Sequence, residues 1–250
     1  MALSGLAVAA MGGVNAASTG YVLVLPALFI LITAGERRLS LLAKWAAAVL
    51  AGTAWWLVPL LLQGRYSFNF LPYIEQAATT FRYMSAAAFL RGAGNWTAYV
   101  DLGTPWLSAG WTEVTSRAAI LAAAVAAGTG LYGLACRDMP ARRWLVASVG
   151  LASAAALTGY WGTLGGPLSG PADQLFDGAL APLRSLYKIE PVVAVALALG
   201  IAHAVSRWAR GGLPVRAGRV PRGAALAPVA ALVLLGLAVP QLSGQVLQPG

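Results

Sequence analysis

Long apolar runs separated by short charged segments make up most of the chain. A helix needs about 20 apolar residues to cross a bilayer, and most of these runs approach that length. The runs lie at residues 2–10, 19–33, 39–62, 118–136, 144–164, 191–204 and 224–239. Because the apolar residues are contiguous and do not alternate with polar ones, the pattern predicts helices and excludes a transmembrane β-barrel. We therefore expect an all-α polytopic membrane protein with about six complete spans.

The pattern also predicts the domain organisation. Residues 1–250 are expected to form one transmembrane module, with no separate soluble domain. The first run is too short to cross and has no charged leader, so we expect a truncated helix of a larger protein and not a signal peptide.

Charged residues in the short connections predict the orientation. Residues 36–44, 137–143 and 207–222 carry an excess of Arg and Lys, which is typical of cytoplasmic loops. The remaining connections, at about 63–117 and 165–190, have nearly balanced charge and are predicted to lie on the outer face. The tryptophans agree with this topology, because Trp45, Trp144 and Trp208 lie next to the basic loops, at the helix ends that are expected to face the cytoplasm. We expect a multi-pass plasma-membrane protein whose active face is outward.

Composition supports the membrane location and limits the function classes. Hydrophobic residues make up 59% of the chain, charged residues 10%, and the mean hydropathy is +0.71. The net charge of +9 is explained by the cytoplasmic loops, so no nucleic-acid partner is expected. The single cysteine, Cys136, excludes a disulfide framework and a thiolate metal site within one chain, and it is expected to be inert. The lone His203 is expected to pack or snorkel within its apolar run.

The segment at residues 171–191 is the most informative part of the sequence, because it places several charged residues between two long apolar runs. Its charged residues are Asp173, Asp177, Arg184, Lys188 and Glu190. The first four have spacings of four, seven and four, which would place them along one face of a helix. Pro182 either breaks that helix or restarts it, and a restarted helix would present free N–H groups to an anion such as phosphate.

The long connection at residues 63–117 has helical composition over residues 71–90. We expect a surface helix with Glu75 and Arg82 on one face and with Phe81 and Phe89 toward the lipid.

The sequence GNWTAYVDLGTPW follows at residues 94–106. Its aromatic and hydrogen-bonding residues are Trp96, Tyr99, Asp101 and Trp106. They suit a sugar or lipid head group, and an aromatic belt at the membrane interface is an equally weighted alternative.

Soluble-enzyme motifs such as a Gly-rich phosphate loop are absent from the sequence. The ionisable residues instead gather in the two predicted outer connections, and the predicted spans carry almost none. A transporter commonly needs charged groups near the bilayer midplane, whereas an enzyme for a lipid-phosphate substrate needs them at the interface. The distribution favours the enzyme.

Four segments, at residues 11–18, 55–80, 94–106 and 174–192, resemble the actinobacterial alpha-arabinofuranosyltransferases of the AftD type, in the same order. The resemblance implies a GT-C glycosyltransferase with outer-face loop helices. It also implies transfer of arabinofuranose from a decaprenyl-phosphate donor to cell-wall arabinan at the outer face of the plasma membrane. A family motif close to R-N-x-H-K-F-D reads R-S-L-Y-K-I-E at residues 184–190 of this chain.

Family members are several times longer, and the resemblance implies a catalytic aspartate on a loop that we expect to precede this chain. Within the chain the candidate acids are Glu75, Asp101, Asp173 and Asp177. Inverting transfer also needs positive charge at the departing phosphate. We expect Arg184 and Lys188 to supply this positive charge, with Arg65 as the second choice. The alternative is that Arg184 and Lys188 anchor the protein to lipid head groups.

Sugar or acceptor contacts are expected from Trp96, Tyr99 and Glu190. No metal ligand is assigned and no cofactor is evident. A divalent cation at Glu75 or Asp101 is an alternative to solvated loop acids. The expected partners are the lipid-linked donor, the arabinan acceptor and the bilayer. Other hypotheses are a mannosyltransferase-like enzyme using another polyprenyl-phosphate sugar, a non-catalytic scaffold that binds lipid-linked sugar, and a transporter.

Overall fold

The computed structural model describes residues 2–11, 15–160 and 166–211. Within these residues the chain is helical and forms no strand beyond an isolated bridge between Asp101 and Pro105. The longer helices are α2 (Ala16–Thr33), α3 (Arg38–Tyr66), α7 (Arg117–Ala135), α8 (Arg142–Thr158) and α10 (Glu190–Gly211). The expected all-α class is confirmed.

Four helical segments are long and apolar enough to cross a membrane: Ala16–Thr33, Gly35–Tyr66, Arg117–Ala135 and Leu186–Ala209. They correspond to α2, α3, α7 and α10. The predicted span at residues 144–164 becomes α8, which has 17 residues. The predicted span at residues 224–239 lies outside the described residues. The chain is a membrane protein.

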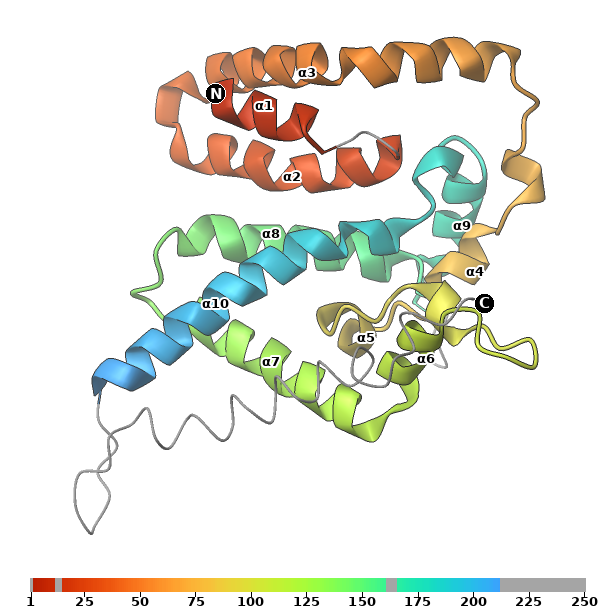
Figure 1. Ribbon diagram of the computed structural model, residues 1–250. Coiled ribbons are helices and arrows are strands. Elements are labelled where there is room, and N and C mark those ends of the chain that lie inside the picture. Colours follow the sequence, from red (N-terminus) through yellow and green to blue (C-terminus); the bar gives the residue numbers. More distant parts are fainter. Residues whose placement is uncertain (1, 12–14, 161–165, 212–250) are drawn as a thin grey trace.

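The long helices lie in layers (Figure 1). The short helix α1 (Ala2–Ala9) packs with α2 and α3, and α8 and α10 lie below them. Helix α7 crosses α10, and the shorter helices gather near the start of α10. These are α4 (Ala77–Phe81), α5 (Ala86–Leu90), α6 (Ser108–Thr115) and α9 (Ser169–Asp177).

Glycines allow α7 and α10 to approach closely. A Cβ atom at Gly133 would overlap the carbonyl oxygen of Gly200, and one at Gly130 would lie 2.8 Å from the carbonyl oxygen of Leu197. Small residues at such crossings let helix backbones meet within a membrane. This close packing fixes the two helices that form one wall of the candidate site.

Side-chain hydrogen bonds join α2 to the rest of the core. The Trp144 Nε1 donates to the Leu25 carbonyl at 2.8 Å, and the Tyr21 hydroxyl donates to the Leu183 carbonyl. At its start, α2 is capped by Asn15, whose side chain accepts from the Ser18 N–H at 2.9 Å. These bonds hold α2 against α8 and against the segment that precedes α10.

The expected surface helix over residues 71–90 is wrong. The segment folds as a 3₁₀ turn, η2 (Leu71–Tyr73), followed by α4 and α5. Ser85 begins the new helix α5, because its hydroxyl accepts from the Ala88 N–H at 3.2 Å. Phe81 and Phe89 are 0% and 1% exposed, so they lie in the protein core and not toward lipid.

The expected helical face through residues 173–188 is also wrong. Helix α9 ends at Asp177, and two short 3₁₀ turns, η4 (Ala181–Leu183) and η5 (Leu186–Ile189), lead into α10. Gly178 follows α9 with a backbone conformation outside the helical region, and Pro182 lies in the first residues of η4. The two residues interrupt the helix, so the four charged side chains do not share one face.

Candidate functional site

A cavity of about 1060 Å³ lies between α2, the segment after α5, α6, α7 and α10. One part is apolar and is formed by spanning helices, with Ala123, Ala126, Ala127, Val193, Leu197 and Ile201 on its wall. The other part carries the polar residues Arg91, Asn95, Glu113, Lys188 and Glu190. The cavity is therefore amphipathic, with charges concentrated near the start of α10.

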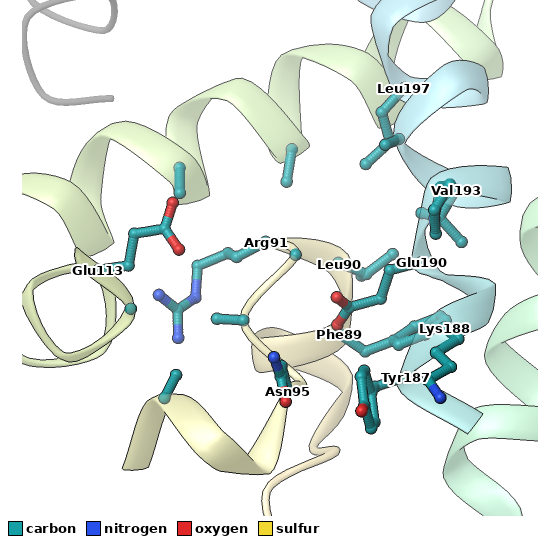
Figure 2. A pocket seen from close by; sticks show the side chains of 18 of the residues that line it. Phe89, Leu90, Arg91, Asn95, Glu113, Tyr187, Lys188, Glu190, Val193 and Leu197 are labelled. Carbon is teal, nitrogen blue, oxygen red and sulfur yellow. The ribbon is translucent and has the colours of Figure 1, made fainter. Parts of the chain in front are cut away.

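The polar groups surround this end of the cavity (Figure 2). Arg91 and Glu113 lie on one side, Glu190, Tyr187 and Lys188 on the other, and Asn95 between them. The Arg91 Nε donates to the Ala87 carbonyl at 3.1 Å, which fixes the direction of its side chain. Partial burial raises the pKa of the Glu113 carboxyl, and the positive charge of Arg91 opposes that shift.

Glu190 is held by the loop that precedes η3 (Trp96–Tyr99). Its Oε1 accepts a hydrogen bond from the Gly94 backbone N–H at 2.7 Å. A Cβ atom at position 94 would lie 2.5 Å from the same oxygen, so this close approach requires glycine. The bond joins residues of the loop to the first residue of α10 and fixes the Glu190 carboxylate at the cavity wall.

The predicted pair Arg184 and Lys188 is separated by the structure. Lys188 lines the cavity, with its Nζ 5.8 Å from the centroid of the Tyr187 ring. Arg184 is not among the cavity residues and is 4% exposed. The expected convergence of the two charges on one anion is therefore not observed.

Arg184 instead links segments that are distant in sequence. Its Nη1 lies 3.2 Å from the Asp177 Oδ1, and its Nη2 donates to the Leu71 carbonyl at 2.6 Å. The same Asp177 oxygen accepts from the Ala77 N–H at 2.8 Å, and the Thr80 hydroxyl donates to the Arg184 carbonyl at 3.0 Å. This network holds α4 and η2 against the segment between α9 and α10.

The candidate acids lie away from the cavity wall. Asp101 is exposed and accepts from the Gly103 N–H at 2.9 Å within a turn. Glu75 precedes α4, and Asp173 and Asp177 belong to α9. None of the four lines the cavity among the described residues, and neither does Arg65, which is exposed near the end of α3.

Sequence reasoning missed Arg91, Asn95 and Glu113 as cavity residues. Arg91 and Glu113 belong to the ionisable residues of the predicted outer connections, but no motif distinguishes them. Asn95 does carry a local signal, because a residue of this type often caps a helical turn. Its Oδ1 accepts from the Thr97 N–H at 3.2 Å.

A second, smaller pocket of about 420 Å³ lies beside α4 and η3. It is lined by Ala78, Thr79, Arg82, Tyr83, Trp96 and Val100. Trp96 is thus placed where a flat ligand could contact it. Tyr99 does not line the pocket: its ring stacks on Tyr83 at 4.1 Å between centroids, and its hydroxyl donates to the Ala93 carbonyl at 2.8 Å. Tyr83, which was not predicted as a site residue, lines this pocket together with Trp96.

Known proteins are similar to this chain in sequence and fold. The chain is 41% identical over 165 residues to an alpha-(1->3)-arabinofuranosyltransferase of Mycolicibacterium smegmatis, covering 66% of this chain and 12% of that protein. It is 36% identical over 208 residues to the Mycobacterium tuberculosis protein of the same name, covering 82% of this chain and 15% of that protein. A cryo-EM structure of the arabinofuranosyltransferase AftD from mycobacteria matches with a TM-score of 0.59 and 28% identity, covering 100% of this chain and 15% of that one.

The helical membrane fold is that of a GT-C glycosyltransferase domain. Residues 1–250 match the family described as alpha-(1->3)-arabinofuranosyltransferase, N-terminal GT-C domain, and the chain belongs to that family. It spans 12% to 15% of the length of the relatives that it matches.

Proposed function

We propose that this protein is the membrane module of an arabinofuranosyltransferase that binds a decaprenyl-phosphate arabinofuranose donor in the cavity beside α10. The donor sugar would pass to cell-wall arabinan at the outer face of a multi-pass plasma-membrane protein. The amphipathic cavity is the observation that carries this proposal. Its charged end suits a phosphate and a sugar, and its apolar part suits the prenyl chain.

Among the described residues, Lys188 and Arg91 are the cationic residues at the cavity wall. A phosphate that leaves the anomeric carbon takes the bonding electron pair, so nearby cations stabilise the departing group. Arg can contact two phosphate oxygens at once, whereas Lys supplies a compact point charge. We assign the donor phosphate to these two residues in place of the predicted Arg184 and Lys188 pair.

Small alanine side chains of α7 and the Val193 and Leu197 side chains of α10 form the apolar wall. A cavity of about 1060 Å³ holds the head group and the first prenyl units, and the rest of the chain extends between helices into lipid. Glu190 and Asn95 are placed to contact sugar hydroxyls. Among the residues of the cavity we assign no catalytic base.

The second pocket is the proposed contact for the arabinan acceptor. Trp96 and Tyr83 offer flat faces to a sugar ring, and Arg82 and Thr79 offer hydrogen-bond donors. Because the pocket is formed by α4 and η3, it lies at the same end of the molecule as the charged part of the large cavity.

Donor binding to the purified 250-residue protein in nanodiscs tests the proposal. Lys188→Ala and Arg91→Ala should each weaken binding of decaprenyl-phosphate arabinofuranose at least about tenfold, which corresponds to ~1.4 kcal/mol. Arg65→Ala is the matched control, because Arg65 is exposed and does not line the cavity. Unchanged affinity in both cavity variants, or a loss confined to Arg65→Ala, would place the phosphate elsewhere.

The apolar part has its own matched pair in α7. Ala126 lines the cavity, whereas Ala124 is exposed and does not. Ala126→Phe should block the prenyl chain and lower donor affinity at least about tenfold, and Ala124→Phe should leave it unchanged. Tighter binding of a polyprenyl-phosphate mannose donor by the unmodified protein would favour the mannosyltransferase hypothesis.

A further inference from the structure

Three potential metal ligands converge where α7 meets α10, at the ends of these helices farthest from the charged part of the cavity. Cys136 follows the last residue of α7, Asp138 lies in the turn to α8, and His203 comes from α10. One ligand atom from each residue lies within 4.8 Å of the others. Figure 1 shows this turn beside α10. The sequence contains no other cysteine or histidine, and spacing alone did not bring these residues together.

His203 points into the cluster with a nitrogen that lacks a hydrogen bond. The imidazole is 10% exposed, and its Nε2 is buried without a hydrogen-bond partner. The Asp138 Oδ1 lies 3.5 Å from that nitrogen, which is a long contact for a hydrogen bond. Buried polar atoms are normally hydrogen-bonded, and the only contact of this nitrogen among the described residues is the long one to Asp138, so it is available to bind an ion.

The distance between the His203 Nε2 and the Asp138 Oδ1 suits a tetrahedral ion. Zinc–nitrogen and zinc–sulfur bonds of about 2.0 and 2.3 Å place neighbouring ligand atoms about 3.3–3.7 Å apart. The separation between His203 and Asp138 falls in that range. The Cys136 Sγ now lies 3.3 Å from the Tyr132 carbonyl, a weak bond that a thiolate would lose on rotating toward the ion.

Charge and exposure are also consistent with a metal site. A thiolate and a carboxylate together neutralise a divalent cation, and sulfur with imidazole favours zinc over magnesium or calcium. Asp138 is 53% exposed, which leaves a route for the ion and a fourth position for water. The Arg207 Nη1 contacts the Asp138 Oδ1 at 2.5 Å and competes for that oxygen, but it also fixes the direction of the carboxylate.

We propose that Cys136, Asp138 and His203 bind a divalent transition-metal ion, with zinc as the best fit. The ion would link the end of α7 to α10. Because these two helices form the apolar wall of the large cavity, the link would stabilise that wall. The proposal does not depend on the identity of the sugar donor.

Cobalt is the direct probe, because its thiolate complexes absorb in the near ultraviolet and tetrahedral sites give strong visible bands. The protein is purified without a histidine tag and titrated with Co²⁺ in detergent. We expect one equivalent to produce both absorptions and zinc to displace them. Cys136→Ser should abolish the thiolate band, and His203→Ala and Asp138→Asn should weaken cobalt binding at least about tenfold. Glu36→Gln, an exposed acid on another turn, is the control.

Thiol labelling covers the case in which a variant folds poorly. In the unmodified protein, zinc should slow maleimide labelling of Cys136 at least about tenfold, and a chelator should restore the rate. His203→Ala should lose this protection while Cys136 remains present. Absence of the thiolate band and of zinc protection in the folded protein would overturn the proposal. A stoichiometry of one metal per two chains, with the thiolate band retained in His203→Ala, would also overturn the proposal, because that pattern indicates a site between two copies of the chain.

Discussion

Arg184 and Lys188 lie four residues apart but belong to different parts of the structure. Lys188 lines the large cavity, whereas the Arg184 guanidinium is buried between Asp177 and the Leu71 carbonyl. Its Nη1 and Nη2 bond to protein oxygens, its Nε is buried without a hydrogen-bond partner among the described residues, and the side chain does not line the cavity. At the residue scale, the family-like motif therefore combines a residue that holds the fold together with a residue that can contact the donor.

Replacing Arg184 should affect stability more than donor binding. Arg184→Met leaves the Asp177 carboxylate without its cation, and Asp177 is 36% exposed, so water compensates part of the loss. We expect the free energy of unfolding to fall by about 2–3 kcal/mol, measured by denaturation in detergent. Lys188→Met should leave stability nearly unchanged and weaken donor binding. A stable Arg184→Met protein that loses donor affinity would contradict this assignment.

Gly94 and Glu190 should behave as a coupled pair. Gly94→Ala places a methyl group 2.5 Å from the Glu190 Oε1, so the carboxylate must move and lose its bond to the backbone N–H, and we expect a destabilisation of about 1 kcal/mol. In a Glu190→Ala background the carboxylate is gone, and adding Gly94→Ala should then cost far less. A double-mutant cycle in thermal unfolding measures this coupling. Additive effects would show that the close approach does not restrict position 94.

At the scale of elements, the spanning helices follow from the apolar pattern. The run at residues 118–136 corresponds to α7 (Arg117–Ala135), and the run at residues 39–62 lies within α3. Such helices are predictable because a continuous apolar segment in a bilayer must satisfy its backbone hydrogen bonds internally. Helix type and position therefore need no knowledge of tertiary contacts.

The shorter elements could not be predicted in the same way, because tertiary contacts decide them. Residues 71–90 have helical composition, but Phe81 packs against Phe176 with ring centroids 5.3 Å apart, and Phe89 also enters the core. The helical composition of this segment does not reveal which aromatic side chains pack into the protein core. Burial of these rings and the Ser85 cap favour two short helices instead.

The α7–α10 crossing gives a test within a single helix. Gly133→Ala would push a methyl group into the Gly200 carbonyl, so we expect a loss of about 2–3 kcal/mol in unfolding free energy. Gly128, in the same helix, has nothing within 4 Å of an added Cβ. Gly128→Ala should be neutral or stabilising by up to about 1 kcal/mol, because alanine favours helix. Equal effects would show that the crossing is not tightly packed.

At the scale of the whole molecule, the candidate site is assembled from segments far apart in sequence. Asn15 comes from the start of α2, Arg91 from the end of α5, Glu113 from α6, and Lys188 and Glu190 from the start of α10. The sequence predicts a phosphate contact for Lys188 and a sugar or acceptor contact for Glu190, and both residues line the cavity. It could not predict Arg91 and Glu113, because only the packing of α5 and α6 against α7 and α10 brings them to the cavity.

The proposed topology can be measured in intact cells. In a Cys136→Ser background, a cysteine at position 101 should be labelled by an impermeant reagent added outside, and one at position 142 should not. The expectation rests on the basic residues around Arg142 and the balanced charge around Asp101. Labelling at position 142 with none at position 101 would reverse the orientation.

The central claim is that the cavity between α2, α7 and α10 holds the lipid-phosphate donor. Photo-crosslinking with a decaprenyl phosphate that carries a diazirine in its first prenyl units tests it most directly. Peptide mapping by mass spectrometry should find the label at Ala123, Ala126 or Ala127 of α7 and at Val193 to Leu197 of α10. Unlabelled decaprenyl phosphate should remove this signal. Competed labelling of the exposed α3 residues Trp55 and Leu61, with none in the cavity, would contradict the account.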